Sequence, residues 1–217
     1  MTTSRKVRWI LASASPRRRE MLAGLGLRFA VDPCVLPEPA IRGGERPRAY
    51  AVRAARMKAR HVAARHRSGL VVGADTVVVC GDAIFGKPST RKEARHMLQR
   101  LSGRWHRVIT GVSVCDSASL RTASGHSESR VHFRRMSPAE IDWYLDTGEY
   151  SDKAGAYGIQ GCAALFIDRI EGCYFNVVGF PVATFERLCR RLGYSLITHL
   201  PVGRPRRPRA SAAANPT

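Results

Sequence analysis

The stretch Gly-Ala-Asp-Thr-Val-Val-Val-Cys-Gly-Asp-Ala-Ile-Phe-Gly-Lys-Pro, residues 73–88, predicts both structure and chemistry. Apolar, β-branched runs on both sides of Gly81-Asp82 are typical of two strands joined by a two-residue turn. In that register Thr76 faces Lys87, with Asp75 beside them, and directly opposed residues lie about 5 Å apart. We therefore expect a carboxylate, a hydroxyl and an ammonium to meet at the open end of one hairpin. The alternative is an ordinary hairpin with a surface ion pair.

Length and composition favour one globular domain. The chain has 217 residues, 44% of them hydrophobic, which is enough for a sizeable core. We expect a domain over residues 1–200 and a disordered basic tail over residues 201–217. No apolar run approaches the roughly 20 residues that a membrane span needs. The N-terminal apolar run is too short for a signal peptide, so we expect a cytoplasmic protein.

Cysteines and charge narrow the possible partners. The six cysteines are scattered without a C-x-x-C pair, so neither a disulfide framework nor a zinc site is expected. The formal net charge of +19 favours a polyanionic partner, whether nucleic acid, phospholipid or nucleotide. We expect at most weak, non-specific association with nucleic acid through the basic tail. Only five of the 36 basic residues are lysines, and because ammonium and guanidinium groups are not interchangeable, each lysine is informative.

A phosphate-binding element is predicted near the N-terminus. Residues 7–12 form a strand-like apolar run, and Ser15-Pro16 is a typical helix start with serine as the N-cap. Three arginines, residues 17–19, then fall in the first helical turn, where the helix dipole is already positive. This crowding is unfavourable unless an anion binds there, so the turn is predicted to cradle phosphate. A solvated basic turn is the alternative.

A long helix is predicted from Pro47 to about Arg67. Its buried stripe combines small or apolar residues with one lysine: Ala51, Ala54, Ala55, Lys58 and Val62. The lysine side chain either extends outward to solvent or points inward. In the second case it needs an anionic partner.

The remaining chain alternates predicted strands and helices. Strand patterns cover residues 105–115, 129–134, 163–168 and 174–178, with a polar loop between the first two. Helices begin at capping signals, Thr90 and Ser137, and a last helix covers residues 182–192. This mixture predicts an α/β fold with a mixed, partly antiparallel sheet flanked by helices.

Four separated motifs can be read together. They are Leu11-Ala12-Ser13-Ala14-Ser15-Pro16-Arg17-Arg18, Met57-Lys58-Ala59, Gly73-Ala74-Asp75-Thr76 with Gly86-Lys87-Pro88, and the run Asp-Lys-Ala-Gly-Ala-Tyr-Gly-Ile-Gln-Gly at residues 152–161. In this order they resemble the Maf family of nucleoside triphosphate pyrophosphatases over roughly residues 7–195. The resemblance implies two lobes around a cleft, like that of inosine triphosphate pyrophosphatases. It also implies hydrolysis of a nucleoside triphosphate to the monophosphate and pyrophosphate with a divalent cation (Mg²⁺ or Mn²⁺), and a homodimer.

The resemblance assigns roles to individual positions. Asp75 resembles the family's proton acceptor. Three positions resemble residues of substrate specificity: Arg17, Thr76 and Gln160. Others match positions that bind phosphate: Ser13, Ser15, Arg18, Lys58, Lys87 and Lys153. Threonine after the catalytic aspartate, and glutamine in the Gly-Ile-Gln-Gly segment, resemble the branch of the family that acts on dTTP and UTP.

These residue types suit cleavage between the α- and β-phosphates. The reaction needs an attacking water, a base or metal to activate it, and cations near the developing charge. Asp75 can serve as the base or as a metal ligand. The family usually has an acidic pair in the loop before the second helix. Here Glu38 alone offers itself, in an unusual Pro-Glu-Pro setting, as a second metal ligand.

Two other functions are weighed against this one. The first is hydrolysis of 7-methylguanosine triphosphate or another modified triphosphate, the substrate class of a sister branch. The second is a nucleic-acid-binding or septum-regulating protein, which the +19 charge suggests. Such a protein needs aromatic platforms among basic residues, whereas the three tryptophans lie within apolar patterns. The sequence therefore favours the enzyme.

Overall fold

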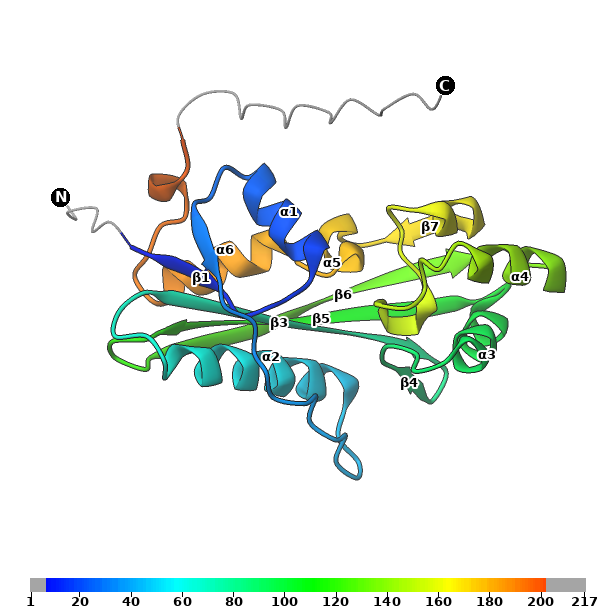
Figure 1. Ribbon diagram of the computed structural model, residues 1–217, viewed down its shortest axis with the longest axis horizontal. Helices are drawn as coiled ribbons and strands as arrows, with labels where there is room; N and C mark the ends of the chain where they lie inside the picture. Colours follow the sequence, from blue (N-terminus) through cyan, green and yellow to red (C-terminus); the bar gives the residue numbers. More distant parts are fainter. Residues whose placement is uncertain (1–6, 202–217) are drawn as a thin grey trace, which may run out of the picture.

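The computed structural model describes residues 7–201 and consists of one sheet with helices on both faces (Figure 1). The predicted tail lies outside the described residues except for Pro201. None of the helices within this range is long and apolar enough to cross a membrane.

The sheet has seven strands in the order β2-β1-β3-β5-β6-β7, with β4 also paired to β3. The strands are β1 (Trp9–Leu11), β2 (Phe29–Val31), β3 (Leu70–Cys80), β4 (Ala83–Phe85), β5 (Trp105–Asp116), β6 (Thr122–Phe133) and β7 (Ile167–Glu171). β1 runs parallel to β2 and β3, and the other pairs are antiparallel. The predicted mixed α/β class is confirmed.

The helices lie in layers on the sheet. They are α1 (Pro16–Gly24), α2 (Pro47–Ala63), α3 (Arg91–Leu101), α4 (Pro138–Asp146), α5 (Tyr174–Val178) and α6 (Val182–Arg191). α2 covers one face of the sheet, and α1, α5 and α6 cover the other (Figure 1). α3 and α4 begin at the predicted caps, since the side chains of Thr90 and Ser137 accept hydrogen bonds from the backbone of Glu93 and Glu140.

Two glycines let α2 lie directly on the sheet. A Cβ atom added to Gly111 on β5 would collide with the carbonyl oxygen of Ala51, and one added to Gly73 on β3 would collide with that of Ala55. The small residues on both sides therefore bring the backbones of helix and sheet together. This close approach carries Lys58, one turn further along α2, to the level of β3.

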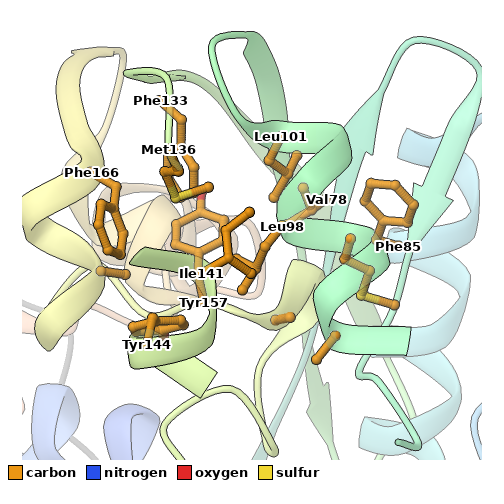
Figure 2. Close-up of a cluster of buried hydrophobic side chains, with 14 of the residues drawn as sticks. Val78, Phe85, Leu98, Leu101, Phe133, Met136, Ile141, Tyr144, Tyr157 and Phe166 are labelled. Atoms are coloured by element: carbon orange, nitrogen blue, oxygen red, sulfur yellow. The ribbon is translucent and has the colours of Figure 1, made fainter. Parts of the chain in front are cut away.

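Buried side chains form two main cores. One core packs α3 and α4 against the far ends of β3, β5 and β6, and Figure 2 shows Val78, Leu98, Phe133 and Tyr157 among its members. The other core packs β1, α1 and α6 together around Trp9. Each core lies around a different part of the sheet, in agreement with the expected two lobes.

The central hairpin is correct at its turn and wrong at its open end. Cys80 pairs with Ala83 as expected, but β4 ends at Phe85 and Lys87 has left the sheet. Thr76 pairs instead with Thr110 on β5. β5 pairs with the opposite edge of β3 and does not compete with β4. β4 ends because the chain turns away from β3 after Phe85, and the carbonyl oxygen of Gly86 accepts a hydrogen bond from Gly155 N at 3.0 Å.

The open end of the hairpin is a window in the sheet. β1 pairs with residues 70–72 of β3, and β4 pairs with residues 78–80 on the same edge. Residues 73–77 therefore have no strand beside them on that edge within the described chain. Because this segment contains Asp75 and Thr76, the window determines where the site lies.

Three other secondary-structure predictions are wrong. Residues 163–166, predicted as part of a strand, lie in the 3-10 helix Cys162–Phe166, and strand β7 begins only at Ile167. Residues 122–128, predicted as a polar loop, are the first half of β6 and pair with β5 along their whole length. Residues 174–178, predicted as a strand, form the short helix α5. Periodicity cannot separate a short buried helix from a buried strand, and cross-strand pairing can hold a polar segment in a sheet.

Candidate active site

A pocket of about 400 Å³ opens at the window in the sheet. It is lined by residues of the β1–α1 turn, α2, β3 and the segment before β7. Every residue proposed for the site from the sequence lines this one pocket: Ser13, Ser15, Arg17, Arg18, Glu38, Lys58, Asp75, Thr76, Lys87, Lys153 and Gln160. Five cationic side chains and three carboxylates meet here, so the lining carries an excess of positive charge.

A buried ion pair forms the centre of the pocket. The Lys58 Nζ atom lies 2.5 Å from Asp75 Oδ1 and 3.3 Å from Glu38 Oε1. Asp75 is only 3% exposed. Lys58 thus points inward, and two carboxylates supply the anionic partners that an inward lysine requires.

The protonation of Asp75 is governed by two opposing effects. Burial raises the pKa of Asp75 because it penalises the charged form, while the charge and hydrogen bond of Lys58 lower it. Burial is the larger effect, and the pKa lies above that of an ordinary aspartate. A raised pKa makes the carboxylate a better proton acceptor than a solvated one.

Arg18 is held by four oxygens, none of them a carboxylate. Its Nε donates to Gly179 O at 2.9 Å, and its Nη1 donates to Ser13 Oγ at 3.1 Å and to Ala74 O at 2.9 Å. Its Nη2 donates to Thr76 Oγ1 at 3.1 Å. Burial lowers the pKa of Arg18, and the guanidinium substitutes for the missing strand by satisfying the Ala74 carbonyl. A fixed cation without an ion-pair partner among the described residues is suited to an anionic ligand.

Two of the three arginines of the predicted phosphate cradle at α1 reach the pocket. Arg17 and Arg18 line the pocket, whereas Arg19 is exposed and does not. Ser15 occupies the N-cap position of α1 but its side chain makes no capping hydrogen bond. Its backbone N–H donates to Ser13 Oγ at 3.3 Å. This part of the pocket therefore combines a serine turn with two guanidinium groups.

Asp152 joins two of the basic residues at the pocket mouth. It accepts hydrogen bonds from Arg17 Nη1 at 3.0 Å and from Lys153 Nζ at 2.7 Å. Lys87 and Gln160 line the same pocket without a hydrogen-bond or ion-pair partner in the part of the chain that the structure describes. Their polar groups are available to a ligand.

Sequence reasoning missed three residues of the site. Asp152 carries no predicted role of its own within its motif, although it anchors Arg17. Thr110 and Asn176 lie outside the four motifs, and they form a buried polar chain behind Thr76. For Asp152 the signal available in the sequence was its place in the motif at residues 152–161, but a motif does not tell which side chains touch.

The carboxylates of Asp75 and Glu38 are suited to a magnesium ion. Both lie within hydrogen-bond reach of the same Lys58 Nζ atom, so they share one wall of the pocket. No group of three or more His, Cys, Asp or Glu side chains within residues 7–201 is placed to hold a metal. Magnesium usually binds one or two carboxylates together with phosphate oxygens and water, so this donor set fits it.

The pocket is rich in cations, contains one buried carboxylate and lies at an open strand edge of an α/β sheet. These features are those of a protein that binds a polyphosphate ligand. The family model described as Maf-like protein matches residues 8–192, and the chain belongs to this family.

The chain matches its curated relatives over almost their whole length. The chain is 44% identical over 187 residues to a protein of Syntrophomonas wolfei named dTTP/UTP pyrophosphatase, covering 86% of this chain and 98% of the relative. A protein of the same name from Moorella thermoacetica is 49% identical over 185 residues, with 85% and 94% covered. The solved HAM1 protein of Coxiella burnetii is 17% identical over 69% of this chain and 86% of that one, with a TM-score of 0.40. A likeness that weak assigns nothing.

Proposed function

We propose that this protein hydrolyses dTTP and UTP to the monophosphate and pyrophosphate. The observation that carries the proposal is the buried Asp75–Lys58 pair inside a pocket rich in cations. Relatives named dTTP/UTP pyrophosphatase, matched over 94–98% of their length, support the choice of substrate. Uridine nucleotides carrying small modifications belong to the same proposal, because no residue identified here requires a particular group at the 5 position.

The residues of the pocket divide the work of hydrolysis. Asp75 accepts a proton from the attacking water, which its raised pKa favours. Arg18, Lys87 and Lys153 bind the phosphate chain and stabilise its developing charge. A divalent cation, Mg²⁺ or Mn²⁺, would be held by Glu38 and phosphate oxygens and would add Lewis-acid stabilisation of those oxygens. Coordination of the cation by Asp75 is the alternative to its role as the base.

Three side chains are proposed to select the base. Arg17, Thr76 and Gln160 line one pocket, and Gln160 has a free amide among the described residues. The amide N–H of Gln160 can donate to the O4 carbonyl that uracil and thymine share and that cytosine lacks. A site built to hydrogen-bond rejects analogues that lack the matching group.

A turnover screen tests the proposal. Pyrophosphate release is measured for dTTP, UTP, dCTP, CTP, the purine triphosphates and 7-methylguanosine triphosphate, each with Mg²⁺, Mn²⁺ or no metal. We expect comparable kcat/KM for dTTP and UTP, with the others about 10- to 100-fold lower. A preference for GTP or its 7-methyl form contradicts the pyrimidine assignment. Release of orthophosphate instead of pyrophosphate contradicts the proposed reaction.

The cytoplasmic location and the homodimer stay proposals. Cell fractionation tests the first, and the molecular mass in solution tests the second.

A second candidate function, nucleic-acid binding, gains one observation. Trp105 is half-buried in β5, and the guanidinium carbons of Arg130 and Arg169 lie 4.6 Å and 5.9 Å from its ring centroid. Trp105 therefore lies among basic residues, although the sequence pattern around the tryptophans predicted no such aromatic platform. An aromatic ring among arginines on a sheet face suits single-stranded nucleic acid. Glu171 pairs with both arginines and weakens the positive charge there.

Two matched variants test this second candidate. Association with a labelled oligo(dT) is followed by anisotropy as a function of salt. Trp105→Ala should weaken it several-fold, the scale of one stacked base. Trp143→Ala, which changes a tryptophan 48% exposed on α4, should not. If removal of residues 203–217 abolishes association while Trp105→Ala has no effect, the basic tail is responsible instead.

A further inference from the structure

A buried chain of hydroxyl groups lies behind Thr76. The Thr110 Oγ1 atom donates a hydrogen bond to the backbone oxygen of Asn176 at 3.0 Å. The Thr76 Oγ1 and Thr110 Oγ1 atoms are also 3.0 Å apart. Thr110 is 0% exposed and does not line the pocket, so it acts on a ligand only through Thr76.

Hydrogen counting fixes the direction of this chain. A threonine hydroxyl carries one hydrogen and two lone pairs. The Thr110 hydrogen goes to a carbonyl oxygen, which can only accept, so the bond between the two threonines must use the hydrogen of Thr76. Arg18 Nη2, which can only donate, uses one lone pair of Thr76 at 3.1 Å. The hydroxyl of Thr76 therefore presents one free lone pair, and no hydrogen, to the pocket.

Asn176, at the end of this series of hydrogen bonds, is held in place by two further hydrogen bonds. The Asn176 side chain donates from Nδ2 to Val108 O at 2.9 Å and to Ser129 Oγ at 3.0 Å. Both acceptors lie on strands of the sheet, and Asn176 is fully buried. Its backbone oxygen is thereby fixed beside Thr110. The polarity of Thr76 is imposed from outside the pocket and does not depend on the ligand.

We infer that Thr110 is a positioning residue for base selection. By holding Thr76 as a hydrogen-bond acceptor, it requires a donor on the substrate. The N3 atom of uracil and thymine carries a hydrogen, whereas N3 of cytosine is an acceptor and would oppose a lone pair. The inference rests on the proposed function, and it explains how the site separates UTP from CTP, which have nearly the same shape.

The ratio of kcat/KM for UTP to that for CTP tests the inference. Thr110→Val keeps the side-chain volume but frees the Thr76 hydroxyl to rotate and donate. We expect the ratio to fall about tenfold or more, the scale of one hydrogen bond. Thr110→Ser keeps the hydroxyl and should restore the ratio to near the wild-type value. If Thr110 had a purely structural role, the substitution would lower kcat/KM equally for UTP and CTP and leave their ratio unchanged. That outcome overturns the inference.

Wild-type protein provides a second test that does not depend on a folded variant. N3-methyl-UTP lacks the N3 hydrogen, and we expect its kcat/KM to be at least as poor as that of CTP. Turnover of N3-methyl-UTP comparable to that of UTP overturns the inference. If wild type does not hydrolyse UTP at all, the proposed function has failed. An unchanged UTP preference in Thr110→Val removes only the role given to Thr110.

Discussion

Asp75 on β3 and Lys58 on α2 form an ion pair of 2.5 Å at the bottom of the pocket. The pair exists because glycines in β3 and β5 let α2 approach the sheet backbone to backbone. The close approach of α2 to the sheet therefore supports both the stability of the fold and the Asp75–Lys58 ion pair, and variants can test each role.

Asp75→Asn should remove the proton acceptor while keeping the side-chain shape. We expect kcat to fall on the order of 10²- to 10⁴-fold, the usual contribution of a general base. Nucleotide binding, measured by calorimetry without turnover, should persist because the other cations of the pocket remain. A loss of only a few-fold in kcat would remove Asp75 from the catalytic role.

The pH dependence should report the raised pKa of Asp75. The base acts when ionised, so a raised pKa makes activity disappear at a higher pH than for an ordinary aspartate, whose pKa is about 3.9. Lys58 lowers this pKa, and Lys58→Met should therefore move the acid limb of kcat/KM to still higher pH. Titration of the triphosphate itself is common to both proteins and cancels in the comparison. A limb that stays in place, or moves to lower pH, contradicts this account.

Lys58→Arg should impair turnover although it keeps the charge. A planar guanidinium does not fit where one nitrogen lies between two carboxylates without displacing them. Displacements of this kind cost about 10- to 100-fold in kcat/KM. Lys92→Arg changes an exposed lysine of α3 and is the matched control. Equal kinetics in wild type and Lys58→Arg would mean that the lysine contributes only charge.

Gly111→Ala should destabilise the protein. Its Cβ would meet the Ala51 carbonyl, so α2 must shift away from β5, at a cost of about 1–3 kcal/mol. Gly43→Ala, at a position where an added Cβ has no atom within 4 Å, is the control. Thermal melts of both variants decide the point. A Tm for Gly111→Ala as high as that of the control would show that the helix does not depend on this contact.

Local sequence signals predicted the parts of the site that are local in the chain. The turn at Gly81-Asp82, the two capped helices and the inward side of α2 follow from residue type and spacing. The resemblance added which distant motifs meet. It could not show that Thr76 faces Thr110 or that Arg18 holds the Ala74 carbonyl, because those contacts depend on strand register and on the end of β4. The polar half of β6 was missed because its stability comes from a neighbouring strand.

The window at residues 73–77 also bears on the solubility of this protein. Unpaired strand edges recruit strands from other molecules and are a common route to aggregation. Here the open edge is five residues long and bounded by β1 and β4, and a guanidinium occupies one of its carbonyls. A foreign strand would have too little backbone to pair with. The protein can thus leave part of a central strand open to small molecules without offering it as a template for misassembly.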